Sequence, residues 1–210
     1  MDEEKFARYG LLAGVAFVVL VVVASLIGGS PPMTSDSDKE ITEYFTDNQD
    51  ALRIGSYLGG LAGVLFLWFL GSLFGRLRRA EGGSGRLSGV ALTGGVVIVA
   101  GAFIANALGA YSALHIESAP GFFRLSAIVF GFVSFAAAVF TSGVAIVLWS
   151  QNVLPKWVGY AGEVIALGWL VAAGAVTTEN DTVAIIGVIV LLAWAVWLVA
   201  LSVLLYRTPE

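Results

Sequence analysis

The sequence predicts an all-α, polytopic membrane protein: a six-transmembrane-helix bundle in a single domain, 1–210, with both termini cytoplasmic. Three features of the sequence support this fold class. The chain is 58% hydrophobic and only 12% charged, whereas roughly a quarter of the residues of a soluble domain are charged. Its apolar residues form six long blocks, and its basic residues gather on alternate connections between those blocks.

Each apolar block is long enough to cross a bilayer, which takes about 20 mostly apolar residues as a helix. No block contains proline, and all five prolines lie between or after the blocks, where the chain must turn. Helix is the expected state because lipid offers no partners for unpaired backbone groups. The predicted spans are 10–28, 54–75, 87–111, 125–149, 157–176 and 183–206.

The first block is expected to be a retained span instead of a cleaved signal peptide. The stretch before it, "MDEEKFARYG", mixes three acidic residues with Lys5 and Arg8. The apolar run that follows is longer than the roughly 7–15 residues of a signal-peptide core.

The orientation follows from the basic residues, because Lys and Arg accumulate on cytoplasmic connections. With the N-terminus inside, only Lys39, Arg53 and Arg124 fall outside. The stretch "GRLRRAEGGSGRLSG" is then a cytoplasmic turn whose arginines meet anionic lipid headgroups. The residues placed on the cytoplasmic side are Lys5, Arg8, Arg76, Arg78, Arg79, Arg86, Lys156 and Arg207.

The longest external segment, 29–53, is acidic. Ser37 followed three residues later by Glu40 is typical of a helix-capping box, and Ile41, Tyr44 and Phe45 then share one helical face. We expect a short amphipathic helix on the outer surface. A solvated acidic loop anchored by aromatic side chains and a partner-binding element are the two alternatives for its role.

Composition excludes several kinds of chemistry. The chain has no cysteine, which excludes disulfides, thiol nucleophiles and Cys-ligated metals. Its one histidine, His115, lies in a predicted external loop, so paired-histidine metal and haem sites are excluded. The isoelectric point near 5.0 argues against nucleic acid as a partner. We predict no catalytic residues, no metal site and no cofactor.

Glu163 is the one acidic residue inside a predicted span. It lies about 9 Å beyond Trp157 along a helix, and ionisable residues inside a membrane are candidates for function. We expect its side chain to point into the bundle and to hydrogen-bond a hydroxyl group. It is either a structural acid near the interface or a proton or cation site. The candidate hydroxyl partners are Ser72, Thr93, Ser142 and Ser202.

Two arginines form a second candidate site on the outer side. Arg53 and Arg124 stand at the external N-termini of predicted helices, where the helix dipole favours anions. Each therefore needs a negative partner nearby. Salt bridges to Asp50, Glu117 or another external carboxylate are one solution, and a bound external anion is the other.

Small residues recur at four-residue spacing within the spans. Helices in lipid rely on such residues for close contact. The ridges are predicted to pack helices within the bundle, and a homo-oligomer through one ridge is the alternative. The residues concerned are Gly55, Gly59 and Gly63 in the second span, Gly101, Ala105 and Gly109 in the third, and Ser134, Ala138 and Ser142 in the fourth.

Several stretches together resemble a known family. They are "GGSPP", "ITEYFTDNQDALRIGSYLGGLAGVLFLWFLGSLFGRLRRAEGG" and "VLPKWVGYAG". The chain resembles a family of bacterial, notably actinobacterial, six-span integral membrane proteins of unknown function. The resemblance implies a six-span fold and a multi-pass location in the bacterial cytoplasmic membrane. It implies no activity and no catalytic residues.

Two functions therefore remain in view. One is a non-enzymatic accessory protein that binds a lipid, a small molecule or a partner helix. The other is a small secondary transporter that uses Glu163 as a coupling site. An intramembrane enzyme is disfavoured because no acid, base and nucleophile lie together in the sequence. A solvated cavity reaching Glu163 would favour transport, and a tightly packed bundle would favour the accessory protein.

Overall fold

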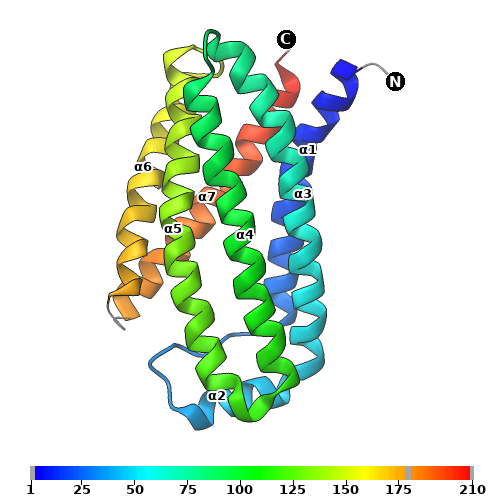
Figure 1. Ribbon diagram of the computed structural model, residues 1–210, viewed down its shortest axis with the longest axis vertical. Helices are drawn as coiled ribbons and strands as arrows, with labels where there is room; N and C mark the ends of the chain where they lie inside the picture. The colour runs from blue at the N-terminus through cyan, green and yellow to red at the C-terminus, as the bar shows by residue number, and fades with distance from the viewer. Residues whose placement is uncertain (1–2, 178–180, 209–210) are drawn as a thin grey trace.

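The computed structural model describes residues 3–177 and 181–208. The described residues are mostly helical and include no strand, which confirms the all-α prediction. Figure 1 shows the long helices running side by side, with a short helix across one end. The elements are α1 (Glu3–Ile27), α2 (Asp38–Asp47), α3 (Gln49–Glu81), α4 (Arg86–Leu114), η1 (Ile116–Ser118), α5 (Ala119–Ser150), α6 (Lys156–Ala172), η2 (Ala173–Val176) and α7 (Asp181–Arg207).

Five of the described helices are long and apolar enough to cross a membrane: α1, α3, α4, α5 and α7. The sixth predicted span, 157–176, has a different form. Its first part is α6, with 17 residues of regular helix, and the chain then tightens into the 3₁₀ helix η2. The five long apolar helices fit a membrane-embedded protein.

The six long helices form a closed ring. Each packs against two neighbours, in the order α1, α3, α4, α5, α6, α7 and back to α1. The turn between α3 and α4 is tight because Gly82, Gly83 and Gly85 adopt positive φ angles, which glycine tolerates without strain. The carboxylate of Glu81 then accepts hydrogen bonds from the Ser88 hydroxyl and amide at 2.6 and 2.8 Å. This contact satisfies the otherwise unpaired start of α4.

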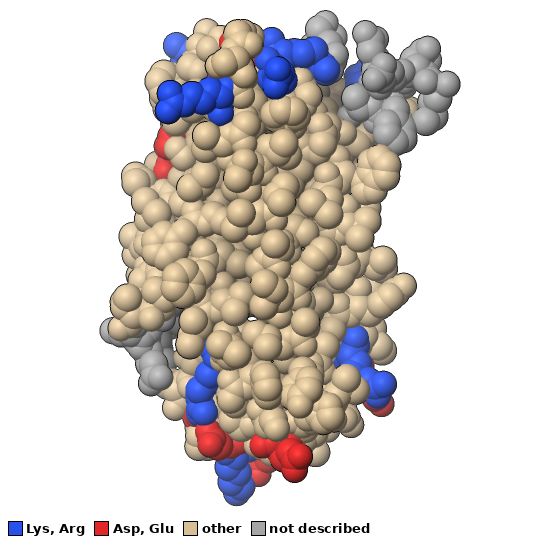
Figure 2. All heavy atoms as spheres, in the orientation of Figure 1, with Lys and Arg blue, Asp and Glu red and all other residues tan. Residues whose placement is uncertain are grey.

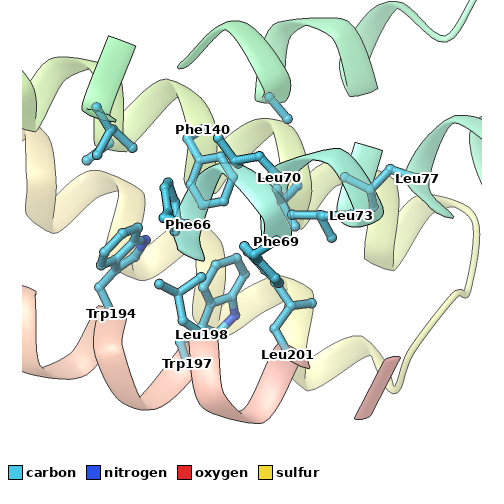
Figure 3. Packing of buried hydrophobic residues seen from close by; sticks show 14 of the residues in the cluster. Phe66, Phe69, Leu70, Leu73, Leu77, Phe140, Trp194, Trp197, Leu198 and Leu201 are labelled. Carbon is cyan, nitrogen blue, oxygen red and sulfur yellow. The ribbon is translucent and has the colours of Figure 1, made fainter. Parts of the chain in front are cut away.

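Aromatic side chains fill the centre of the ring. Phe66 of α3, Phe140 of α5 and Trp194 of α7 pack on one another with ring centroids 5.7–6.1 Å apart (Figure 3). Phe17 of α1 and Trp169 of α6 each pack edge-to-face with Trp194. Phe66 and Phe140 are fully buried. The axis of the bundle is therefore occupied by side chains from five of the six helices.

The two ends of the bundle differ in charge. On the face shown in Figure 2, Lys and Arg gather at the end that holds the α3–α4 turn, and most acidic side chains lie at the other end. The start of α1 and the end of α7 lie at the arginine-rich end (Figure 1). There Arg8 and Arg76 donate to the backbone oxygens of Tyr206 and Thr208 at 2.8 and 2.9 Å. Cations at a helix C-terminus are favourable to its dipole, so these arginines also hold the end of α7.

Helix α2 covers the acidic end of the bundle. The predicted capping box is present, because the Ser37 hydroxyl accepts from the Glu40 amide and the Glu40 carboxylate accepts from the Ser37 amide. Hydrogen bonds from the Ser37 hydroxyl and amide hold the pKa of the Glu40 carboxyl below its usual value. Ile41 and Phe45 are buried against Ala113 and other residues of the bundle.

The acidic segment is thus a packed helix and not a solvated loop. Its apolar face is covered within the chain, and the Tyr44 hydroxyl donates to the backbone oxygen of Gly28 at 2.8 Å. Helix α3 begins at Gln49, a few residues before the apolar block that starts at Ile54. The acid Asp50 in the first turn of α3 is favourable to the helix dipole, so polar residues extend this helix beyond its apolar part.

Candidate functional site

An open groove of about 340 Å³ lies between α4, α5 and α6. Small and aliphatic residues of α5 line it between the aliphatic side chains of α4 and α6, which are called its walls below. The wall residues Val90, Leu167 and Leu170 are 42–64% exposed, which shows that the groove opens on the outside of the ring. Its lining consists of Leu87, Val90, Ala138, Val139, Ser142, Gly143, Ile146, Glu163, Ala166, Leu167 and Leu170.

Glu163 and Ser142 are the two residues of this lining with polar side chains. The Ser142 hydroxyl lies 3.0 Å from Oε2 and 3.3 Å from Oε1 of Glu163, and donates to the carboxylate. The structure thus confirms the predicted hydrogen bond between Glu163 and a hydroxyl of another span. The Glu163 side chain is half-buried.

Glycines of α6 bring the two side chains together. A Cβ atom on Gly159 would lie 2.8 Å from the Trp149 Cβ, and one on Gly162 would lie 2.8 Å from the Ala145 Cβ. Both distances are shorter than van der Waals contact, so α6 can approach α5 this closely only with glycine at these positions. These two glycines therefore leave the room that α5 needs to pack closely against α6.

The predicted direction of Glu163 needs correction. The side chain does not point to the centre of the bundle but lines the groove on its outer side. The centre is occupied by Trp194 and its aromatic neighbours. On α6, the inward face belongs to Gly162, which contacts Trp197, and to Trp169, which packs on Trp194. The acid is therefore left at the α5–α6 seam.

The other three candidate hydroxyls lie elsewhere. Ser72 of α3 packs against Gly10 of α1, and the buried Ser202 of α7 packs against Gly14 of α1. Thr93 is exposed on α4 and donates to the backbone oxygen of Gly89 in its own helix at 3.0 Å. Only Ser142 is brought to Glu163, because α5 is the helix that packs against this face of α6.

Arg53 and Arg124, which lie at the acidic end of the bundle, form the expected salt bridges. Arg53 lies 3.7 Å from Asp50, one turn earlier on α3, in an exposed pair worth about 0–1 kcal/mol. Arg124 pairs with Asp38 at 2.6 Å. Glu117 is exposed in η1 and belongs to neither pair.

Arg124 also donates to two backbone oxygens of the segment before α2. Its Nε lies 3.0 Å from the oxygen of Thr34, and its Nη2 lies 2.9 Å from the oxygen of Asp36. The guanidinium thereby joins the start of α5 to the segment that leads into α2. Its three contacts make Arg124 a structural residue at this end of the bundle.

The glycine ridge of α3 is used within the chain. Gly63 packs against the Phe103 ring, Gly59 against the Asn106 side chain, and Gly55 against the backbone oxygen of Ala24. Such contacts agree with packing inside the bundle and leave this ridge covered.

On α4, the glycine nearest the backbone of another helix is one that the sequence analysis did not single out. Gly101 packs against Val133 of α5, while a Cβ on Gly109 would have no atom within 4 Å. The closest contact with the backbone of another helix is at Gly94, where a Cβ would lie 2.8 Å from the backbone nitrogen of Phe140. No spacing pattern singles out Gly94 in the sequence.

The groove combines one carboxylate, one hydroxyl and aliphatic walls. Small-molecule sites are mostly apolar and use a few polar groups to fix the ligand, so this arrangement can hold an apolar body and one polar group. Comparison with known proteins adds nothing to this description, because no family model, curated protein or solved structure matches the chain. The resemblance to six-span bacterial proteins stays a prediction, and the function has to be inferred from the groove itself.

Proposed function

We propose that this chain is a six-span protein of the bacterial cytoplasmic membrane, with both termini inside, that binds an amphiphilic molecule in the groove between α4, α5 and α6. It acts as a non-enzymatic accessory protein. The observation that carries the proposal is the hydrogen-bonded acid Glu163 in an otherwise aliphatic, outward-facing groove. An acid in such a place is costly, and a bound polar group would compensate for that cost.

The six-span arrangement is supported by the length of the α6–η2 rod. Its 17 α-helical and four 3₁₀ residues rise about 33 Å in total, which is enough to cross the roughly 30 Å hydrocarbon thickness of a typical bilayer. The chain then crosses six times, so the two ends of the described chain lie on one side. The concentration of arginines at that end supports a cytoplasmic position.

Cysteine labelling tests this topology, since the chain has no native cysteine. A cysteine at Lys39, whose side chain is 84% exposed, is expected to react with an impermeant maleimide in intact cells. A cysteine at Ser84 in the α3–α4 turn is expected to react only after the membrane is opened. Equal labelling of both in intact cells would refute the proposed topology, and the reverse pattern would refute the orientation.

Binding is favoured over transport by the position of the acid. A coupling site in a transporter needs access from both sides of the membrane, whereas the ring axis beside Glu163 is filled by Phe66, Phe140 and Trp194. The groove opens sideways, where lipid would lie, and a ligand can therefore enter from the bilayer. This geometry fits a protein that holds its ligand within one half of the membrane.

Filling the groove tests the binding function. We expect Val139→Trp to lower labelling of the α5 and α6 groove peptides about tenfold, because the indole would occupy the groove and remove about 1.4 kcal/mol or more of contacts. The protein is reconstituted in phosphatidylcholine nanodiscs and exposed to two ten-carbon photoreactive probes, an alcohol and an amine. Labelled peptides are quantified by mass spectrometry.

The matched control is Val96→Trp. Val96 and Val139 are 47% and 45% exposed, but Val96 does not line the groove. The control variant is expected to label like the unmodified protein. If neither probe labels the groove above other lipid-facing segments, or if both tryptophan variants behave alike, the binding function is wrong.

A further inference from the structure

We infer that the groove takes a protonated primary or secondary amine on a small aliphatic body. This inference rests on the proposed function and names the class of ligand. It follows from three properties of the groove: its charge, its lack of aromatic side chains, and the position of its acid.

The charge of the groove is negative and incompletely satisfied. Its lining contains no basic side chain, and Glu163 is its one charged residue. The Ser142 hydroxyl supplies a single proton to the carboxylate, which has about four acceptor positions. A charge in apolar surroundings is costly unless it is paired. The complementary ligand group is therefore a cation with N–H donors, and an anionic group would be repelled.

The side chains that line the groove indicate which class of cation it can bind. Quaternary ammonium groups have no N–H donor and are recognised by the faces of aromatic rings. No aromatic side chain lines this groove. An ammonium group that keeps two or three N–H bonds can instead use the free acceptor positions of Glu163. The groove volume of about 340 Å³ lies at the small end of the roughly 300–1,000 Å³ usual for ligand sites, so the apolar body is small.

The position of the acid favours a free amine over the headgroup of an amine-bearing phospholipid. Glu163 lies two turns from Lys156, the first residue of α6, which is about 10 Å along the helix. In phosphatidylethanolamine the amine is joined to a phosphate, which would have to enter the groove beside the carboxylate. The lining offers that phosphate no basic residue. A lipophilic amine without phosphate has no such conflict.

The test compares three ten-carbon photoreactive probes that differ only in their headgroup: a primary amine, a trimethylammonium group and an alcohol. In phosphatidylcholine nanodiscs, the amine is expected to label the groove peptides about tenfold more than the other two probes, which corresponds to about 1.4 kcal/mol. Glu163→Gln is expected to reduce amine labelling to the level of the alcohol. Glu163→Asp keeps the charge and is expected to retain the preference for the amine.

The control is Glu117→Gln, which removes an exposed acid of η1 outside the groove and should leave labelling unchanged. When phosphatidylethanolamine replaces phosphatidylcholine in the nanodiscs, labelling by the amine probe should not decrease. A decrease would show that the lipid headgroup competes for the site and would assign the site to the lipid.

Equal labelling by amine and alcohol, or unchanged labelling in Glu163→Gln, would overturn the inference and leave the binding function standing. Equal labelling by the trimethylammonium probe would overturn the requirement for N–H donors. If no probe labels the groove, the inference and the proposed function both fail.

Discussion

Gly94→Val is expected to lower the free energy of unfolding of the bundle by about 3 kcal/mol, at the upper end of the usual cost of overpacking. A Cβ at this position would lie 2.8 Å from the backbone nitrogen of Phe140 and 3.1 Å from the backbone oxygen of Ala136. Backbone atoms cannot rotate out of the way as a flexible side chain can, so α4 and α5 would have to separate. Unfolding in detergent, followed by tryptophan fluorescence, measures the loss.

Gly109→Ala on the same helix is the matched control. A Cβ there would meet no atom within 4 Å, and alanine is favoured over glycine inside a helix by roughly 0.5–1 kcal/mol. This variant is expected to be as stable as the unmodified protein or slightly more stable. If both variants unfold at the same denaturant concentration, the close approach of α4 to α5 at Gly94 is not part of the native packing.

The sequence located the helices well because apolar length is a local property. The blocks between the prolines correspond to the long helices, and the capping box at Ser37 and Glu40 marked the start of α2. Contacts between helices were harder to foresee. Gly94 lies in the pair Gly94–Gly95, and its importance depends on Phe140 lying opposite, which requires knowledge of the ring order. The chain has 26 glycines, so spacing alone cannot identify the one nearest another backbone.

The candidate site was predictable only in part, because its residues can be found in the sequence but the contacts between them cannot. An acid in an apolar block is conspicuous, so Glu163 was found, and Ser142 was among four hydroxyls at similar depth. Choosing Ser142 required the neighbours of α6 to be known. The outward position of Glu163 was missed because the bundle centre is filled by aromatic side chains such as Trp194, which composition does not reveal. One signal was present, however, since the small residues Ala138 and Ser142, at four-residue spacing, both line the groove.

Glu163→Leu is expected to separate binding from folding. Labelling of the groove by the amine probe should fall about tenfold or more, because the substitution removes the one charge of the lining. The free energy of unfolding should change by less than about 1 kcal/mol, since a hydrogen bond between membrane helices is worth about 0.6 kcal/mol on average. The Ser142 hydroxyl can also turn to the backbone oxygen one helical turn earlier. Both quantities are measured on the same nanodisc preparation.

A binding role and a structural role of Glu163 predict opposite results for this variant. If the acid were mainly structural, its loss would leave a buried partner unsatisfied and cost about 1–3 kcal/mol, with labelling reduced only as far as the fold is lost. A half-buried acid at the edge of an open groove is poorly placed for such a role. Leucine is also easier to insert into a membrane than a charged residue, by about 3 kcal/mol at the helix centre. An acid that hinders insertion and adds little to folding is expected where a bound ligand depends on it. A marked loss of stability in Glu163→Leu, with normal amine labelling of the protein that still folds, would assign Glu163 to the fold and remove it from the binding site.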